Sequence, residues 1–251
     1  MPMFSGDDDA IRVTVFASST PETAAVFVEA AAEFGRGAAQ AGLVSVFGGG
    51  NAGCMGAFYK AVHATGGRLR GITHRMFVKP GGSSLSEENA AELESLEIVE
   101  GRDLTMRKRR LLDAGDCLVA LPGGVGTFDE LFMAIGERGL PNGGGLPVLV
   151  LNTNGYYDGA LQQLQRAHKE GMLRKHWTDY AEVVTTPQAA VEWCSRQRRR
   201  ARDAPPVATS PDAASSSSSV AYRQGIAHGL LLASAALVVA AAAAGVRARR
   251  T

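Results

Sequence analysis

The sequence predicts an α/β protein with a doubly wound, mostly parallel sheet and helices on both faces. Short apolar runs alternate with longer helical patterns over residues 11–200. Two of these runs, Leu43–Phe47 and Cys117–Leu121, pass directly into glycine-rich turns that precede a helix. In an open parallel sheet such turns lie at the carboxyl ends of the strands, where ligands bind. A Rossmann-like fold is therefore expected.

Seven stretches are predicted as strands, because they are short, apolar and bounded by turn residues. They are 11–17, 43–47, 69–73, 97–99, 117–121, 147–151 and 182–185. Seven segments between and after them are predicted as helices: 18–42, from 55 onward, 83–97, 105–114, 128–137, 156–170 and 187–200. Ser18 to Pro21 is expected to supply the cap and first turn of the first helix.

The most informative stretch is CLVALPGGVGTFDEL, residues 117–131. Pro122 ends its apolar run, and Thr127 is predicted as the N-cap of a helix that starts at Phe128. Three glycines between them allow a sharp turn and the close approach of a ligand: Gly123, Gly124 and Gly126. Unpaired N–H groups at a helix N-terminus favour an anion, most often a phosphate.

Glu130 has two interpretations. It follows Thr127 by three residues, which is the spacing of a capping box. Alternatively it has its own chemical role, in which case a nearby cation must offset its charge beside an anion site. The spacing of Thr127 and Glu130 alone does not decide between these two interpretations.

A second glycine turn follows the strand 43–47 and satisfies the dinucleotide pattern GxGxxG. The acidic residue expected about twenty positions later is missing, because the strand 69–73 ends in His74 and Arg75. A nicotinamide dinucleotide is therefore disfavoured.

Bulk properties exclude several classes of function. A net charge of +1 gives no reason to propose a nucleic-acid partner. The three cysteines are widely separated, which indicates neither a metal site nor a disulfide framework and favours a reducing compartment. The acidic residues 1–10 lack an apolar signal region and are expected to be disordered.

The composition changes after residue 200. Residues 201–224 are rich in Ser, Pro and Ala and read as a linker, and residues 225–247 are apolar and long enough for a bilayer core. With the basic end 248–251, they predict a hydrophobic helix that anchors the domain, facing the cytosol, in an organelle membrane. Since much of the apolar stretch is alanine, a helix packed on a partner or on the domain is the alternative.

Four consecutive cations lie on the predicted helix 105–114: Arg107, Lys108, Arg109 and Arg110. Neighbouring residues on a helix are about 100° apart, so at most two of the four can face one site.

Three motifs resemble those of the LOG family, the cytokinin-activating phosphoribohydrolases that are often labelled lysine decarboxylases. PGGVGTFDE, residues 122–130, resembles PGGxGTxxE; DLTMRK, residues 103–108, is similar to a family segment that ends in an Arg-Lys pair; and VFGGGNAGCMGA, residues 46–57, is similar to GGGxxGxMG. Their order and spacing match over roughly residues 11–195.

The resemblance implies hydrolysis of the N-glycosidic bond of a nucleoside 5′-monophosphate, which releases free base and ribose 5-phosphate. It implies Arg107 and Glu130 as the catalytic pair, a homodimer with the site near the interface, and no metal or organic cofactor. The residues expected to bind the substrate are Ser18, Gly50, Lys108, Gly123, Gly124, Val125, Gly126, Thr127, Phe128 and Asp129.

The chain departs from the plant-type pattern after the glycine turn. Residues 133–138, MAIGER, replace a Thr-Trp-x-Gln-Leu-Gly segment, so the preferred base stays open between N6-prenylated adenine, adenine and another base. A non-catalytic carrier of a phosphorylated pterin is the alternative, because it needs the same phosphate-binding turns. Lysine decarboxylation is discounted, since none of the five lysines lies in an apolar context that would suit pyridoxal phosphate.

Overall fold

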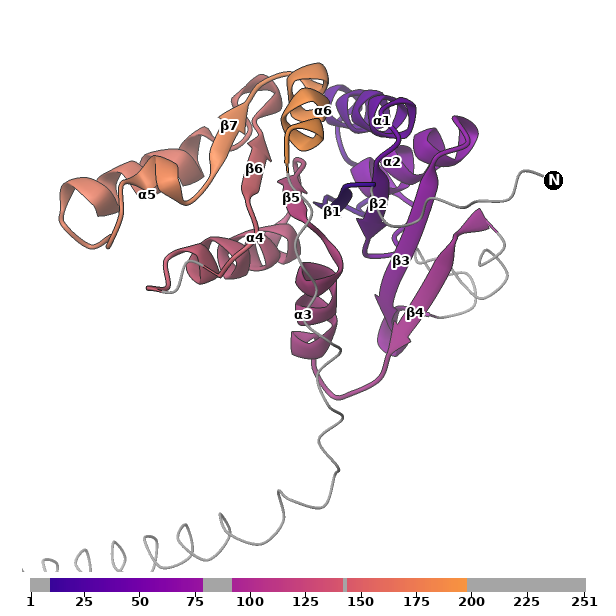
Figure 1. The fold of residues 1–251 in the computed structure, drawn as a ribbon, viewed down its shortest axis with the longest axis horizontal. Coiled ribbons are helices and arrows are strands. Elements are labelled where there is room, and N and C mark those ends of the chain that lie inside the picture. Colours follow the sequence, from indigo (N-terminus) through magenta and orange to yellow (C-terminus); the bar gives the residue numbers. More distant parts are fainter. Residues whose placement is uncertain (1–9, 79–91, 142–143, 198–251) are drawn as a thin grey trace, which may run out of the picture. The chain divides into compact units, whose positions relative to one another are not determined.

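The computed structural model describes residues 10–78, 92–141 and 144–197 (Figure 1). Their sheet has seven strands, all parallel, in the order β4-β3-β2-β1-β5-β6-β7. The strands are β1 (Arg12–Phe16), β2 (Val44–Phe47), β3 (Arg68–His74), β4 (Ser95–Val99), β5 (Cys117–Ala120), β6 (Val148–Leu151) and β7 (Glu182–Val184). The predicted parallel α/β sheet is confirmed.

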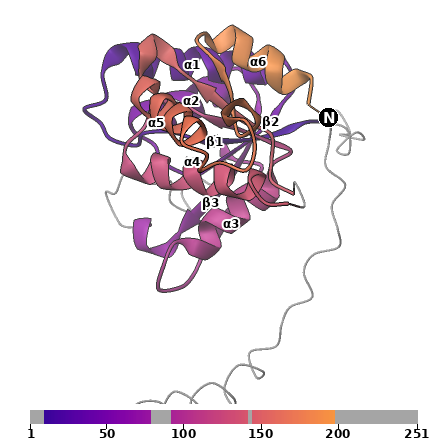
Figure 2. The ribbon, with the colours of Figure 1, turned by 90° about the vertical axis from the view of Figure 1, so that its left-hand side faces the viewer.

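Helices cover both faces of this sheet (Figures 1 and 2). The α-helices are α1 (Ala25–Gln40), α2 (Gly53–Ala64), α3 (Thr105–Ala114), α4 (Val125–Arg138), α5 (Asp158–Lys169) and α6 (Pro187–Ser195). Short 3-10 turns are η1 (Arg75–Phe77), η3 (Thr153–Gly155) and η4 (Trp177–Asp179). One apolar core joins the sheet to α1, α2 and α6, and a second joins it to α3, α4 and α5.

The strand order reverses between β1 and β5. From β1 the chain proceeds outward through β2, β3 and β4, and it then returns to β5 on the other side of β1. The loops that follow β1 and β5 therefore diverge at the carboxyl edge of the sheet. This is the topological switch point at which open α/β sheets bind ligands.

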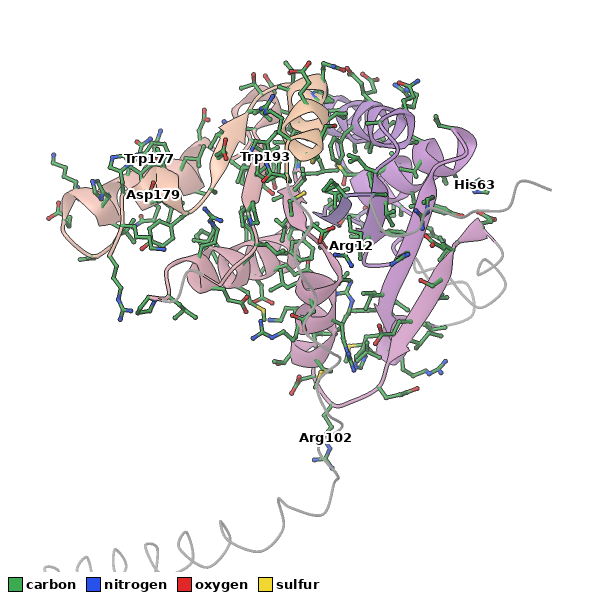
Figure 3. The ribbon with its side chains drawn as sticks, in the orientation of Figure 1. Arg12, His63, Arg102, Trp177, Asp179 and Trp193 are labelled. Carbon is green, nitrogen blue, oxygen red and sulfur yellow. The ribbon has the colours of Figure 1, made fainter. Side chains whose placement is uncertain are left out.

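The opposite ends of the same two strands are joined by a buried ion pair. The Arg12 guanidinium donates to both carboxylate oxygens of Asp116, with Nε 2.8 Å from Oδ2, and the Arg12 backbone N–H donates to Oδ2 at 2.9 Å. Arg12 lies inside the molecule at the start of β1, whereas Arg102 extends away from it (Figure 3). This pair fixes the amino end of β1 against that of β5.

Two predicted helix starts are wrong. The first helix begins at Ala25, not in Ser18–Pro21, because the Ser18 backbone bridges other segments: its N–H donates to the Pro122 carbonyl at 3.1 Å and its carbonyl accepts from the Met55 N–H at 2.8 Å. The helix after the central turn begins at Val125, with Gly124 as its N-cap. Thr127 is therefore the third residue of α4, where its side chain is buried against Gly123, and it makes no cap.

Other predicted boundaries shift by a few residues. Residues 95–97, predicted as the end of a helix, belong to strand β4 because they pair with β3. Residues 83–91 of that predicted helix lie outside the described residues. Helix α6 ends at Ser195 rather than near residue 200.

The predicted linker (201–224), membrane anchor (225–247) and basic end (248–251) also lie outside the described residues, as do residues 1–9. Within the described ranges, each helix is too short or too polar to cross a bilayer.

Candidate functional site

A cavity of about 310 Å³ opens at the switch point. Five segments surround it: the loop after β1, the loop from β2 into α2, η1, the start of α3 and the start of α4. The lining residues are Ala17, Ser18, Ser19, Thr20, Gly48, Gly50, Met55, Phe77, Leu104, Arg107, Lys108, Gly124, Val125, Gly126, Thr127, Asp129 and Glu130.

The N-terminus of α4 forms one wall of the cavity. The first four N–H groups of a helix have no acceptor within it, and in α4 these belong to Gly124, Val125, Gly126 and Thr127. All four residues line the cavity. Together with the positive end of the helix dipole, these donors form a site for an anion.

The glycines between β5 and the first turn of α4 fall into two groups. A Cβ on Gly123 would collide with the Thr127 side chain and lie 2.8 Å from the Ser18 nitrogen, so packing excludes a side chain there. A Cβ on Gly124 or Gly126 would meet nothing within 4 Å. Gly126 lies inside the first turn of α4, where glycine costs about 1 kcal/mol relative to alanine. Packing does not require glycine at these two positions, whereas a ligand that approaches the backbone would.

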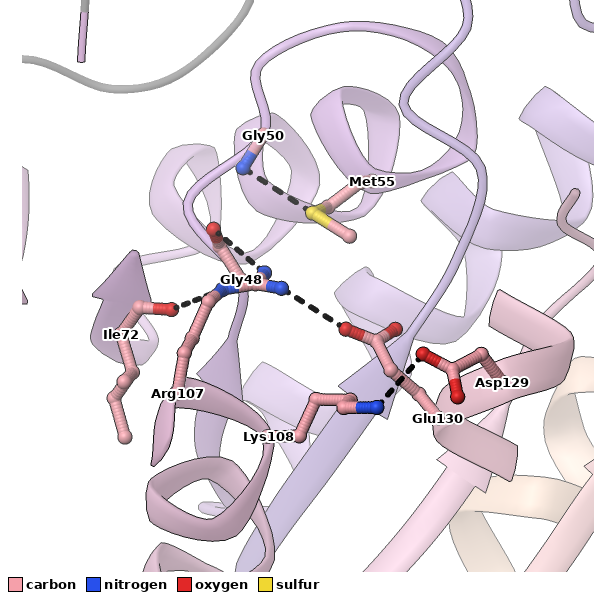
Figure 4. A network of polar contacts seen from close by, with 8 residues as sticks. All are labelled: Gly48, Gly50, Met55, Ile72, Arg107, Lys108, Asp129 and Glu130. Carbon is pink, nitrogen blue, oxygen red and sulfur yellow. Dashed lines mark hydrogen bonds and ion pairs between the residues drawn. The ribbon is translucent and has the colours of Figure 1, made fainter. Parts of the chain in front are cut away.

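Arg107 reaches the cavity from the first turn of α3 and is fixed by three segments (Figure 4). Its Nε donates to the Ile72 carbonyl at 3.2 Å, its Nη2 to the Gly48 carbonyl at 3.2 Å, and its Nη1 to Glu130 Oε1 at 3.0 Å. The guanidinium carbon also lies 5.5 Å from the centre of the Phe77 ring. A cation in the first turn of a helix opposes the helix dipole, so its charge must be offset. Glu130 supplies that offset.

Glu130 is buried, with 8 % of its surface exposed, although it lines the cavity. Burial raises the pKa of its carboxyl, and the Arg107 guanidinium acts in the opposite direction. The ion pair keeps a carboxylate in a site that already attracts an anion. Because Glu130 bonds to Arg107 and Thr127 is no N-cap, the capping-box interpretation of Glu130 is wrong.

Two of the four consecutive cations on α3 face the cavity, which is the largest number that helical geometry was expected to allow. Arg107 and Lys108 line the cavity, and the Lys108 ammonium donates to Asp129 Oδ2 at 2.8 Å (Figure 4). Arg109 instead pairs with Glu137 at 2.5 Å and Arg110 with Glu97 at 3.5 Å, both half exposed. Neither of these two lines the cavity.

Ten of the twelve residues predicted for the site line this cavity, and two do not: Gly123 and Phe128. Phe128 faces the aromatic rings of Tyr156 and Tyr157 instead. The lining residues that were not predicted for the site are Ala17, Ser19, Thr20, Gly48, Met55, Phe77 and Leu104. The Ser-Ser-Thr run after the first strand was a usable signal, because loops at the carboxyl ends of parallel strands carry ligand contacts. Phe77 has no comparable signal in the sequence, since it comes close to Arg107 only through the path of β3.

The fold and the site together define a doubly wound α/β protein with an anion-binding helix N-terminus and a buried Arg-Glu pair at the switch point. A family model described as "Possible lysine decarboxylase" matches residues 55–194. The chain belongs to this family, the LOG family.

Curated relatives carry a common name. The chain is 30% identical over 183 residues to the probable cytokinin riboside 5′-monophosphate phosphoribohydrolase LOGL2 of Oryza sativa subsp. japonica, over 72% of this chain and 70% of that protein. It is 32% identical over 163 residues to the cytokinin riboside 5′-monophosphate phosphoribohydrolase of Rhodococcoides fascians, over 64% of this chain and 77% of that protein.

Solved structures resemble the chain in fold. The molybdenum cofactor carrier protein of Chlamydomonas reinhardtii superimposes with a TM-score of 0.51 at 20% identity, over 73% of this chain and 95% of that one. The molybdenum cofactor binding protein of Rippkaea orientalis gives a TM-score of 0.51 at 19% identity, over 74% of this chain and 94% of that one. At this identity the likeness concerns the fold alone.

Proposed function

We propose that this protein hydrolyses the N-glycosidic bond of a nucleoside 5′-monophosphate and releases free base and ribose 5-phosphate. The observation that carries the proposal is the buried Arg107–Glu130 pair in the same cavity as the open N-terminus of α4. The names of the family members support this reaction class.

The substrate's phosphate would bind the N–H groups of Gly124 to Thr127. Glu130 lies one helical turn beyond Gly126, a rise of about 6 Å along α4. The ribose of a bound monophosphate would therefore lie beside the Glu130 carboxylate. In this arrangement the phosphate sets the position of the sugar relative to the carboxylate.

Departure of the base breaks the bond between C1′ and the base nitrogen, and positive charge develops on the sugar ring. The Glu130 carboxylate would stabilise this charge and accept a proton from the water that attacks C1′. The base leaves with the bonding electron pair and takes up a proton from solvent, to which Glu130 returns the proton that it accepted. Arg107 holds the carboxylate in place and offsets its charge beside the phosphate.

The substrate base is proposed to be adenine or an N6-modified adenine, the cytokinin type named in the relatives. Purified protein is incubated with AMP and with isopentenyl-AMP, and free base and ribose 5-phosphate are quantified by chromatography. We expect equal amounts of the two products from at least one substrate, and loss of most of both with Glu130→Gln. Tight binding of a phosphorylated ligand without base release would instead favour the pterin-carrier alternative.

We also make a proposal about the oligomeric state of the protein and one about its location in the cell. We propose a homodimer, which would cover apolar residues at the cavity mouth such as Val125, which is 84 % exposed. We also propose, from sequence alone, that residues 225–247 anchor the protein in a membrane. Light scattering tests the dimer. Fractionation of the full chain, with a chain ending at residue 202 as control, tests the anchor: a full-length protein that stays soluble after ultracentrifugation would contradict it.

A further inference from the structure

The backbone carbonyls of the turn between β5 and α4 are each held by a hydrogen bond from another segment. The Leu121 carbonyl accepts from the Tyr157 hydroxyl at 2.6 Å, and the Pro122 carbonyl accepts from the Ser18 N–H at 3.1 Å. The Gly123 carbonyl accepts from the Tyr156 hydroxyl at 2.7 Å. Hydrogen bonds from other segments thus fix the orientation of three successive carbonyls.

The hydrogen bond from Tyr156 to the Gly123 carbonyl affects the cavity, because it orients the peptide group between Gly123 and Gly124. The Gly123 carbonyl and the Gly124 N–H belong to the same planar trans peptide and point in opposite directions. A bond that fixes the carbonyl therefore fixes the N–H as well. Gly124 lines the cavity, and in the described residues its N–H has no acceptor. Tyr156 thus sets the direction of one of the four donors of the anion site.

Tyr157 and Tyr156 differ in whether burial requires their hydroxyl to have an acceptor inside the protein. Tyr157 is 1 % exposed, so its hydroxyl needs an acceptor inside the protein for stability alone. Tyr156 is 37 % exposed, and water could serve its hydroxyl. Burial alone does not account for its bond to Gly123.

The Tyr156 ring is itself fixed. It packs edge-on against Phe27 of α1, with ring centres 5.1 Å apart, and nearly parallel to Phe128 of α4 at 6.4 Å. It follows a turn in which Asn154 (φ 52°) and Gly155 (φ 72°) both adopt left-handed backbone conformations. A left-handed conformation is uncommon outside glycine, and it persists where the surroundings impose it. The turn directs both tyrosines toward residues 121–123.

We propose that Tyr156 is a positioning residue for the substrate's 5′-phosphate, acting through the Gly123–Gly124 peptide without touching the phosphate. This inference rests on the proposed function, since it assigns the helix N-terminus to a 5′-phosphate. It also gives Phe128 a role outside the cavity, as the support of the Tyr156 ring.

The test is Tyr156→Phe, which removes the hydroxyl and keeps the ring. Calorimetry measures the Kd of ribose 5-phosphate and of adenosine, which lacks the phosphate. We expect the Kd of ribose 5-phosphate to rise about five-fold, the equivalent of one hydrogen bond of about 1 kcal/mol, with the Kd of adenosine unchanged. Tyr180→Phe, a buried tyrosine outside the cavity lining, is the matched control and should change neither value.

The outcomes separate this inference from the proposed function. An unchanged Kd for ribose 5-phosphate in folded Tyr156→Phe, or an equal loss for adenosine, would overturn the positioning role. Binding of ribose 5-phosphate by the unaltered protein without base release from any monophosphate tested would overturn the proposed reaction alone. If the unaltered protein binds no ribose 5-phosphate, both are wrong.

Discussion

Arg107 and Glu130 lie 23 residues apart in the chain and meet in a buried ion pair, with Nη1 3.0 Å from Oε1. Arg107 comes from the first turn of α3 and Glu130 from the second turn of α4, and both line the cavity. An ion pair in such a place is costly to bury, so its value lies in holding a carboxylate at a set position.

Glu130→Gln should abolish most base release and leave phosphate binding intact. Glutamine has nearly the same shape but carries no charge, so it can neither stabilise the developing cation nor accept a proton. We expect kcat to fall by about 10²–10³-fold or more, the range for loss of one electrostatic group. Turnover assays with isopentenyl-AMP and calorimetry with ribose 5-phosphate measure the two effects. Unchanged turnover would remove Glu130 from the reaction.

The activity should decline in acid at a pH above the ordinary carboxyl pKa of 4.5. Burial raises the pKa of Glu130, and the reaction needs its ionised form, so activity is lost as the pH falls through this raised pKa. The neighbouring charge of Asp129 also raises this pKa. Asp129→Asn should therefore move the acid limb of kcat/KM to lower pH. Glu137→Gln, which alters a carboxylate paired with Arg109 outside the cavity lining, should leave the limb in place.

Arg107→Ala should lose both activity and stability. It leaves Glu130 as an uncompensated buried charge, and breaking a buried pair costs about 3–5 kcal/mol. Arg109→Ala removes a half-exposed cation two residues away and should change the free energy of unfolding by less than about 0.5 kcal/mol. Denaturant unfolding measures the loss of stability, and base release measures the loss of activity. Equal losses in the two variants would indicate a diffuse effect of positive charge.

Gly126→Ala should stabilise the fold and weaken phosphate binding. Alanine is the better helix former by about 1 kcal/mol, and its methyl group meets no protein atom within 4 Å. That methyl would occupy the space next to the donors of the anion site. Gly136→Ala, on the same helix and equally open, is the matched control: it should raise the melting temperature without changing the Kd of ribose 5-phosphate. If Gly126→Ala binds ribose 5-phosphate normally, the phosphate does not lie against this turn.

Local pattern was enough to predict the parallel sheet and several boundaries. Helix α3 begins and ends at the predicted residues, Thr105 and Ala114, because its periodicity and flanking glycine are local signals. The start of α1 was mispredicted because Ser18 resembles a cap, whereas its backbone groups bond to Pro122 and Met55 across the sheet. Hydrogen bonds between residues so far apart in the chain cannot be predicted from a short stretch of sequence.

The same limit applies within the site. The glycine turn and the Arg-Lys pair were visible as motifs, and they do meet in one cavity. The burial of Arg107, the position of Phe77 beside it and the bond from Tyr156 to the turn depend on which strands are neighbours. Tyr156 reads in sequence as the first residue of an amphipathic helix. Only the pairing of β5 with β6 brings it to Gly123.

The ion pair of Arg12 with Asp116 lies at the amino ends of the two strands whose carboxyl ends carry Ser18 and Pro122. If β1 slid past β5 by one residue, the offset would be about 3.3 Å and every side chain of the strand would change face. The Ser18 N–H would then miss the Pro122 carbonyl, and the donors of α4 would no longer face the carboxylate at their present spacing. Transplanting this pocket onto another doubly wound scaffold therefore requires carrying over Arg12 and Asp116, although neither comes near a substrate.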